Sequence, residues 1–287
     1  MRLIKQIAVI AAALAATTSL VCGDRLQASE TFTEIDVPGA SFTAAESINP
    51  RGEIVGLYFD GSGNGHGFLL NNGAFTTIDV PGATFTIAIT INPQGDIVGF
   101  YSDASGSSHG FLLSNGAFTT IDAPGATDTF AIGINSRGDI VGDYADGSGN
   151  THGFLLSDGA FTTIDVPGAV HTEGQAINPQ GDIVGLYIDS SSNSHGFLLS
   201  KGSFTTIDVP GAAETLAFNI NPRGDIVGNF TDSSGNTHGY LLRKGRFITI
   251  DIPGATQTDS NAINPRGDIV GDFTDSTGNT HGFLLRQ

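Results

Sequence analysis

The stretch that decides the fold runs from residue 42 to residue 84 and reads FTAAESINPRGEIVGLYFDGSGNGHGFLLNNGAFTTIDVPGAT. This pattern recurs with a period of 43 residues and without internal insertion or deletion: five copies are complete, and the sixth, from residue 257, has its fourth strand at the start of the repeats instead. The phrase Ile-Asp-x-Pro-Gly marks the period with one aspartate per copy, at Asp36, Asp79, Asp122, Asp165, Asp208 and Asp251. Such self-similarity is typical of a repeat architecture in which each copy is one supersecondary unit.

Each unit is predicted to contain four short strands separated by turns. In the quoted unit, Asn49-Pro50-Arg51-Gly52 fits a type I turn, Asn72-Gly73 a two-residue hairpin, and Val80-Pro81-Gly82 a type II turn. The segments between these turns are rich in β-branched and aromatic residues, which favour strands. The expected strands are residues 42–48, 53–60, 66–70 and 74–80.

A repeated four-stranded meander of about 40–50 residues is typical of β-propeller blades. A β-solenoid is the competing architecture, and the ends of the repeat region distinguish the two. The first repeated segment, from Phe32, corresponds to the fourth strand of a unit. The last repeated segment, HGFLLRQ, corresponds to the third strand of a unit. A closed ring uses such an offset to complete its last blade, whereas an open stack needs polar caps. We therefore predict an all-β protein: one six-bladed β-propeller over residues 31–287, closed by the N-terminal strand.

The repeats resemble the extracellular repeat family named after its His-Ala-Phe motif. The motif is written here as His-Gly-Phe or His-Gly-Tyr, after a Gly-Asp-Ile-Val-Gly strand, and glycine replaces the alanine in all six copies. The resemblance covers Phe32 to Gln287. It implies an exported, β-propeller-like protein and no particular chemistry.

The N-terminal segment is predicted to be a secretory signal peptide. Arg2 and Lys5 precede an uncharged run over residues 7–21, which is the length of a signal-peptide apolar region. Cleavage after Gly23, or as late as Ala28, suits a signal peptidase. Cys22, the only cysteine, is then removed; lipid anchoring through it is the alternative. We expect a secreted, periplasmic or extracellular protein.

The charge of the chain limits its partners. It carries 29 acidic and 12 basic residues, a net charge of −17, which argues against nucleic acid as a partner. No later stretch is apolar for long enough to span a membrane. The loops after the second and fourth strands of every unit share one end of the blades, here called the acidic loop face, and they hold twelve aspartates. We expect a monomer that binds a cationic or amphipathic ligand or protein.

The loops after the second strands are candidate calcium sites. Asp60, Ser62 and Asn64 place oxygen atoms at alternate positions, as at the start of a calcium loop. Each loop holds one carboxylate and lacks a late bidentate glutamate, so any calcium site is weak, and no other cofactor is expected. The alternative is a tight hairpin closed by an Asp–His hydrogen bond. The aspartates in question are Asp60, Asp103, Asp146, Asp189, Asp232 and Asp275.

The first strands carry the residues that break the sixfold symmetry. Three alternate positions in each, which we call a trio, differ from blade to blade, and period-two spacing places a trio on one face of its strand. Because the innermost strand of a propeller lines the axis, these positions can form a unique axial site; a loosely packed channel that tolerates drift is the alternative. The residues chosen as axial ligand contacts are Asp128, His171, Glu173, Gln175, Glu214 and Asp259.

Three functions remain open from the sequence. The first is an exported, non-enzymatic propeller that binds a ligand or partner at its acidic loop face and axial mouth. The second is a hydrolase or lyase with an axial site, in which Glu173 or Asp259 acts as a base beside His171. The third is a structural envelope protein with weak calcium loops.

Overall fold

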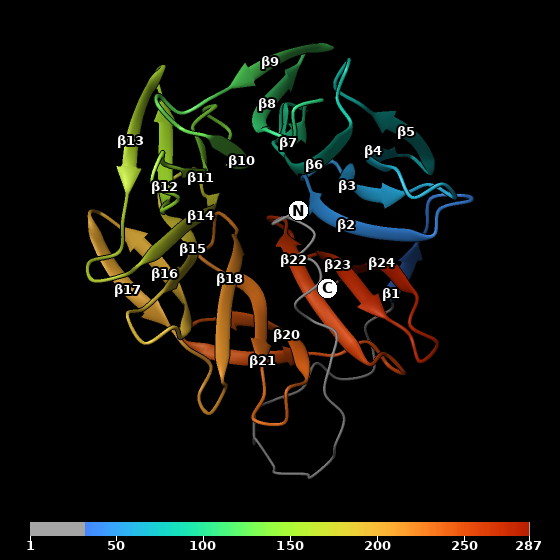
Figure 1. Cartoon of the computed structure of the whole chain (residues 1–287). Helices are drawn as coiled ribbons and strands as arrows, with labels where there is room; N and C mark the ends of the chain where they lie inside the picture. The colour runs from blue at the N-terminus through green and yellow to red at the C-terminus, as the bar shows by residue number, and fades with distance from the viewer. Residues whose placement is uncertain (1–31, 287) are drawn as a thin grey trace.

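The computed structural model describes residues 32–286, which form six four-stranded antiparallel sheets arranged around a central axis (Figure 1). The six-bladed propeller predicted from the sequence is confirmed. No helix occurs in this part of the chain, and hence none long and apolar enough to cross a membrane. The predicted signal peptide and Cys22 lie outside the described residues.

Each blade runs outward from the axis in the order of its strands. Blade one contains β2 (Phe42–Ile48), β3 (Ile54–Phe59), β4 (Gly65–Asn71) and β5 (Ala74–Ile78). Blade two contains β6 (Phe85–Ile91), β7 (Ile97–Ser102), β8 (Ser108–Ser114) and β9 (Ala117–Ile121). Blade three contains β10 (Asp128–Ile134), β11 (Ile140–Ala145), β12 (Thr151–Ser157) and β13 (Ala160–Ile164).

The second half of the ring repeats this order. Blade four contains β14 (His171–Ile177), β15 (Ile183–Ile188), β16 (Ser194–Ser200) and β17 (Ser203–Ile207). Blade five contains β18 (Glu214–Ile220), β19 (Ile226–Thr231), β20 (Thr237–Arg243) and β21 (Arg246–Ile250). Blade six contains β22 (Gln257–Ile263), β23 (Ile269–Thr274), β24 (Thr280–Leu285) and, as its outer strand, β1 (Phe32–Ile35).

The ring closes as predicted, through the N-terminal strand. β1 pairs antiparallel with β24, with Phe32 opposite Leu285 and Ile35 opposite Gly282. Ile35 is buried, and the Phe32 ring packs edge-on against Phe273 at 6.1 Å. The first and last parts of the described chain therefore share one sheet, and no outer strand of blade six is left unpaired.

The turns have the predicted conformations because their residues suit them. Gly52 closes the first turn by donating its N–H to the Asn49 carbonyl at 3.0 Å. In the hairpin, Asn72 and Gly73 have φ angles of 49° and 81°, as a type I′ turn requires. Gly82, at φ 84°, allows the Ala83 N–H to reach the Val80 carbonyl at 3.0 Å.

Every innermost strand carries a β-bulge that the sequence pattern did not predict. In β2 the register shifts between Ala45 and Ser47, so that Glu46 has no partner on β3. A side chain on Gly56 would meet the Ala44 carbonyl oxygen, because a Cβ atom built there lies only 2.0 Å from it. The glycine that ends each Gly-Asp-Ile-Val-Gly phrase therefore lets the bulged strand lie close to its neighbour.

The apolar core lies between neighbouring blades. Val55 of blade one packs with Ala88, Ile97 and Phe111 of blade two, and the same arrangement recurs around the ring. A large ring is fully buried at the third strand of each blade, at Phe68, Phe111, Phe154, Phe197, Tyr240 and Phe283. Burial of one such ring stabilises the fold by about 1.5–3 kcal/mol.

Blade five differs at this core position, which leads to a first prediction. The Tyr240 hydroxyl is buried and has no hydrogen-bond partner among the described residues. Because an unpaired buried hydroxyl costs about 1–3 kcal/mol, Tyr240→Phe should raise the free energy of unfolding by about that amount in urea denaturation. Phe197→Tyr is the matched control and should lower it. Loss of stability in Tyr240→Phe would contradict this account of the core.

Candidate ligand-binding site

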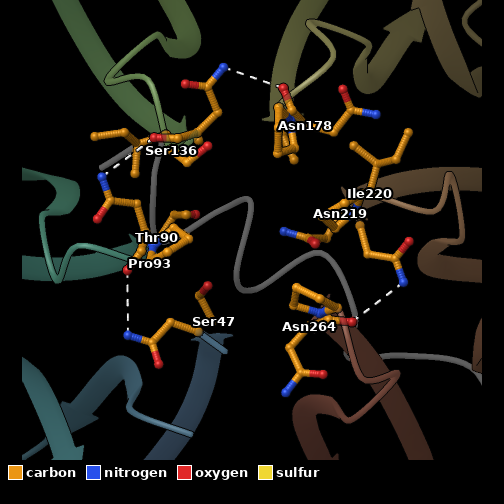
Figure 2. A pocket seen from close by; sticks show the side chains of 18 of the residues that line it. Ser47, Thr90, Pro93, Ser136, Asn178, Asn219, Ile220 and Asn264 are labelled. Atoms are coloured by element: carbon orange, nitrogen blue, oxygen red, sulfur yellow. Dashed lines mark hydrogen bonds between the residues drawn. The ribbon is translucent and has the colours of Figure 1, made fainter. Parts of the chain in front are cut away.

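The axis opens into a depression lined by all six turns between first and second strands (Figure 2). Its volume is about 580 Å³, including the solvent at its mouth. Its rim consists of the turn asparagines, Asn49, Asn92, Asn135, Asn178, Asn221 and Asn264. It lies at the end of the blades opposite the acidic loop face. Binding at the acidic loop face, predicted from the sequence, stays a prediction.

The turns around this depression also brace the ring. The Asn49 carboxamide accepts the Arg51 N–H at 2.9 Å and donates to the Asn92 carbonyl of blade two at 3.4 Å. Arg51 pairs with Glu53 and donates to the Pro93 carbonyl at 2.7 Å. Equivalent bonds from Arg266 reach Pro50 across the closure. These turn residues therefore have a structural role.

Deeper in the channel, blades one to three present an apolar wall. Leu57, Ile87 and Phe100 form one buried cluster. Successive phenylalanine rings lie 5.0 to 6.4 Å apart across these blades and form what we call the aromatic ladder: Phe42, Phe59, Phe85, Phe100 and Phe130. Aromatic pairs at these distances attract one another beyond simple area burial. Of the ladder, Phe100 is buried, and only the half-buried rings of Phe42, Phe59, Phe85 and Phe130 keep some exposed apolar surface.

Blade four brings three of the predicted site residues together. His171 Nε2 lies 2.6 Å from Glu173 Oε1, and the Gln175 amide donates to Glu173 Oε2 at 2.9 Å. Glu173 is 7% exposed. Across the interface with blade three it faces Asp143, which is also 7% exposed and accepts no hydrogen bond from any described residue. We call Asp143 and Glu173 the acidic pair.

A second set of polar groups lies where blades five, six and one meet. Asp259 accepts hydrogen bonds from Asn229 of blade five and, at 2.7 Å, from Gln257 of its own strand. Asp272 accepts a hydrogen bond from Asn261 at 2.9 Å. Polar groups therefore gather at the interfaces of blades three and four and of blades five, six and one, whereas the interfaces of blades one to three hold the aromatic ladder.

Burial changes the acidity of these carboxyl groups. It raises the pKa of Glu46 to about 7, with a further contribution from the charge of Asp259. It raises the pKa of Asp259 to about 6. Burial also raises the pKa values of Asp143 and Asp272 well above the usual range, and nearby carboxylates add to both shifts. Burial therefore favours the protonated form of all four groups.

The other two predicted site residues bond to the preceding blade instead. Asp128 Oδ1 accepts the Ser108 backbone N–H at 3.0 Å, and Glu214 lies 3.5 Å from the Ser194 hydroxyl. Each binds the start of a third strand rather than the His171 group. Both occupy the first trio position of their blades, and there they contact the third strand of the preceding blade.

The loop aspartates, our candidate calcium ligands, cap their own loops. Asp60 Oδ1 accepts the backbone N–H groups of Ser62 and Asn64 at 2.8 and 2.9 Å, and the Asn64 amide donates to Oδ2 at 2.9 Å. These hydrogen bonds, the Asn64 side-chain bond first, lower the pKa of Asp60 to about 2. Calcium would have to displace them, and weak calcium binding here stays a prediction.

Each repeated histidine joins the two rings of aspartates on the acidic loop face. His66 Nδ1 lies 3.0 Å from Asp79, its Nε2 lies 3.6 Å from Asp60, and its ring stacks on Tyr58 at 5.2 Å. At blade six, His281 approaches Asp36 at 3.0 Å and Asp275 at 3.6 Å. The geometry is that of a hairpin closed by histidine and aspartate, the alternative raised from the sequence.

Sequence reasoning missed the polar residues of the second strands. The position after each Gly-Asp-Ile-Val-Gly phrase differs from blade to blade, as the trios do: Leu57, Phe100, Asp143, Leu186, Asn229 and Asp272. That variation was visible in the sequence. Its meaning depends on packing: four of these residues lie beside the middle trio residue of the next blade, namely Leu57, Phe100, Asp143 and Asn229.

Comparisons with known proteins agree with this fold. Solved structures that resemble it include AofleA from Arthrobotrys oligospora, with 14% identity, 90% of this chain and 86% of that chain covered, and a TM-score of 0.57. The Aleuria aurantia lectin, solved with Fucα1-6GlcNAc, shows 11% identity, 85% and 93% coverage, and a TM-score of 0.55. TolB from Acinetobacter baumannii shows 12% identity, 82% and 64% coverage, and a TM-score of 0.58.

At these identities the likeness concerns the fold alone. No family model and no curated protein matches the chain, so the resemblance to the His-Ala-Phe repeat family stays a prediction.

Proposed function

We propose that this chain is an exported, non-enzymatic propeller that binds an amphipathic ligand in its axial channel. The observation that carries the proposal is the uneven wall around the axis, apolar at the aromatic ladder of blades one to three and polar at the interfaces of blades three and four and of blades five and six. A ligand with one apolar and one polar side can satisfy both halves, since buried polar groups need partners. The signal peptide predicted over residues 1–23 supports export.

The depression at the turn face is a candidate entrance for the ligand. The depression at the turn face is lined by Ser47 and Ala176, which directly follow the last trio residues, Glu46 and Gln175. The last trio residues, Glu46 and Gln175, therefore lie next to the inner end of this depression. Its position favours entry from the turn face rather than from the acidic loop face.

The proposal is tested with three amphiphiles that share an octyl chain: octylammonium, octyl glucoside and octyl sulfate. Calorimetric titration of the mature protein should detect binding of the neutral or the cationic probe. Replacing the blade-four trio by its blade-two counterpart (His171→Phe, Glu173→Ile, Gln175→Ile) should weaken that binding about tenfold or more. Folding should persist, because blade two already holds those residues at the same positions.

Asp189→Ala, in an outer loop of the same blade, is the control and should leave affinity unchanged. If Asp189→Ala abolished binding and the trio exchange did not, the loops would carry the function and the axial site would be wrong. Absence of binding for all three probes would also reject the proposal.

One observation favours an enzyme as the second candidate. The pair formed by His171 and Glu173, beside Asp143, whose pKa burial raises, is an arrangement that proton transfer could use. A hydrolase or lyase would lose turnover in the double variant His171→Ala/Glu173→Ala, whereas a binding protein would show no turnover to lose. A screen of ester, glycoside and lyase substrates separates the two.

A further inference from the structure

The depression at the turn face is lined by uncharged residues. Its lining consists of asparagines, serines, a threonine, a glycine and an alanine, together with one isoleucine from every blade and the prolines of five turns. The four arginines of these turns do not line it, and each forms an ion pair with the acidic residue two positions later, as Arg51 does with Glu53. Because a charge that leaves water needs a charged or hydrogen-bonding partner, this lining favours a neutral ligand.

Four polar groups of this lining form no hydrogen bond within residues 32–286. They are the side-chain hydroxyls of Ser47, Thr90 and Ser136 and the amide nitrogen of Asn219. The amide oxygen of Asn219 does have a partner, because it accepts the Ile263 N–H at 3.4 Å. Figure 2 shows the amide nitrogen turned toward the middle of the depression. All four groups are therefore available to a ligand.

These four groups break the sixfold symmetry of the depression. Ser47, Thr90 and Asn219 occupy a repeat position that holds glycine or alanine in the other three blades, and Ser136 stands where the other five turns have proline. Three of the groups come from blades one, two and three, and the fourth comes from blade five, which lies across the ring from blade two. The depression therefore presents hydrogen-bonding groups from two opposite sides.

The chemistry of the lining suits a compact ligand with several hydroxyl groups. A hydroxyl both donates and accepts hydrogen bonds, so it can pair with a serine or threonine hydroxyl and with an amide nitrogen. The prolines and isoleucines between these groups offer apolar contacts to the C–H faces of a sugar ring. The volume of about 580 Å³, including solvent at the mouth, falls in the range of small-molecule sites, roughly 300–1,000 Å³. A rigid ring also loses less conformational entropy on binding than an open-chain polyol.

We propose that the depression at the turn face binds a neutral sugar ring. The amide nitrogen of Asn219 donates to a ligand hydroxyl on the side of blade five. The hydroxyls of Ser47, Thr90 and Ser136 bind ligand hydroxyls on the side of blades one to three. This site goes beyond the axial site proposed above, because it uses no trio residue and requires no apolar tail on the ligand.

The probes are the methyl glycosides of glucose, galactose and mannose, titrated into the mature protein and followed by NMR. At least one should bind, and about fivefold or more tightly than the uronate, the amino sugar and the alditol of the same configuration. Asn219→Ala should weaken that binding about threefold to tenfold, the loss expected for one hydrogen bond. Ser136→Pro should weaken it by a similar factor. Both variants should fold, because other blades hold alanine and proline at the equivalent positions.

Asn236→Ala is the matched control, since it removes an asparagine of the same blade that bonds to Asp232 on the acidic loop face, and it should leave affinity unchanged. Absence of binding for all three methyl glycosides would overturn the assignment, as would unchanged affinity in a folded Asn219→Ala/Ser136→Pro variant. Equal affinity for the alditol or for the uronate would overturn the choice of a neutral ring. The trio exchange should weaken binding of octyl glucoside but not of a methyl glycoside, so the axial site and this site can fail separately.

Discussion

A chain that lacks residues 1–38 is expected to unfold about 10–20 °C below a chain that lacks only residues 1–30. Removing β1 exposes the partner edge of β24 and deletes Ile35, whose burial contributes about 1.5–3 kcal/mol. The ladder hydrogen bonds of four residue pairs and the Asp36–His281 contact are also lost, and the total is roughly 5 kcal/mol. At this size, 1 kcal/mol changes Tm by about 2–4 °C.

Calorimetry and size-exclusion chromatography check this expectation. The shorter chain should also form aggregates, because a long unpaired edge is a template for pairing with other chains. Within the full chain, Ile35→Ala should cost about 2–4 kcal/mol, whereas Thr33→Ala, at an exposed position of the same strand, should cost little. Equal melting temperatures for the two truncated chains would contradict closure through β1.

Glu46→Gln is expected to stabilise the protein at pH 8 by roughly 3 kcal/mol and to have little effect at pH 4. The pKa of Glu46 is raised from its usual value of 4.5 to about 7 in the folded state. A group with a raised folded pKa contributes its stability below pH 4.5 and loses it as the pH rises through about 7. One pKa unit corresponds to about 1.4 kcal/mol, and glutamine cannot ionise.

The raised pKa values of Asp143, Asp259 and Asp272 also make the folded state less stable as the pH rises. The unliganded protein should therefore be more stable near pH 5 than at pH 8, as measured by urea unfolding. The histidines with raised pKa values add to this trend, because their contribution is also lost as the pH rises. Glu214→Gln, at an exposed channel residue, is the control. A Glu46→Gln gain equal at pH 4 and pH 8 would reject the buried-carboxyl explanation.

The number of blades and the closure of the ring could be predicted because they depend on local chemistry repeated at a constant spacing. Asn72-Gly73 specifies a two-residue hairpin and Pro81-Gly82 a turn wherever they occur, and the offset at the two ends of the repeats leaves one strand to be supplied by Phe32–Ile35. The hydrogen-bonding distance between His66 and Asp79 follows from the same short-range register, since both lie within one hairpin.

The site was only partly predictable. Alternation along β14 was enough to group His171, Glu173 and Gln175, because they belong to one strand. It could not show that Asp143 faces Glu173 or that Asn229 bonds to Asp259, because these partners lie on different blades, 30 residues apart. Their meeting depends on how neighbouring sheets pack and on the bulge beside Gly142 and its equivalents, which re-aims the innermost strand. Side chains from separate sheets are brought together by core packing, which a strand pattern does not encode.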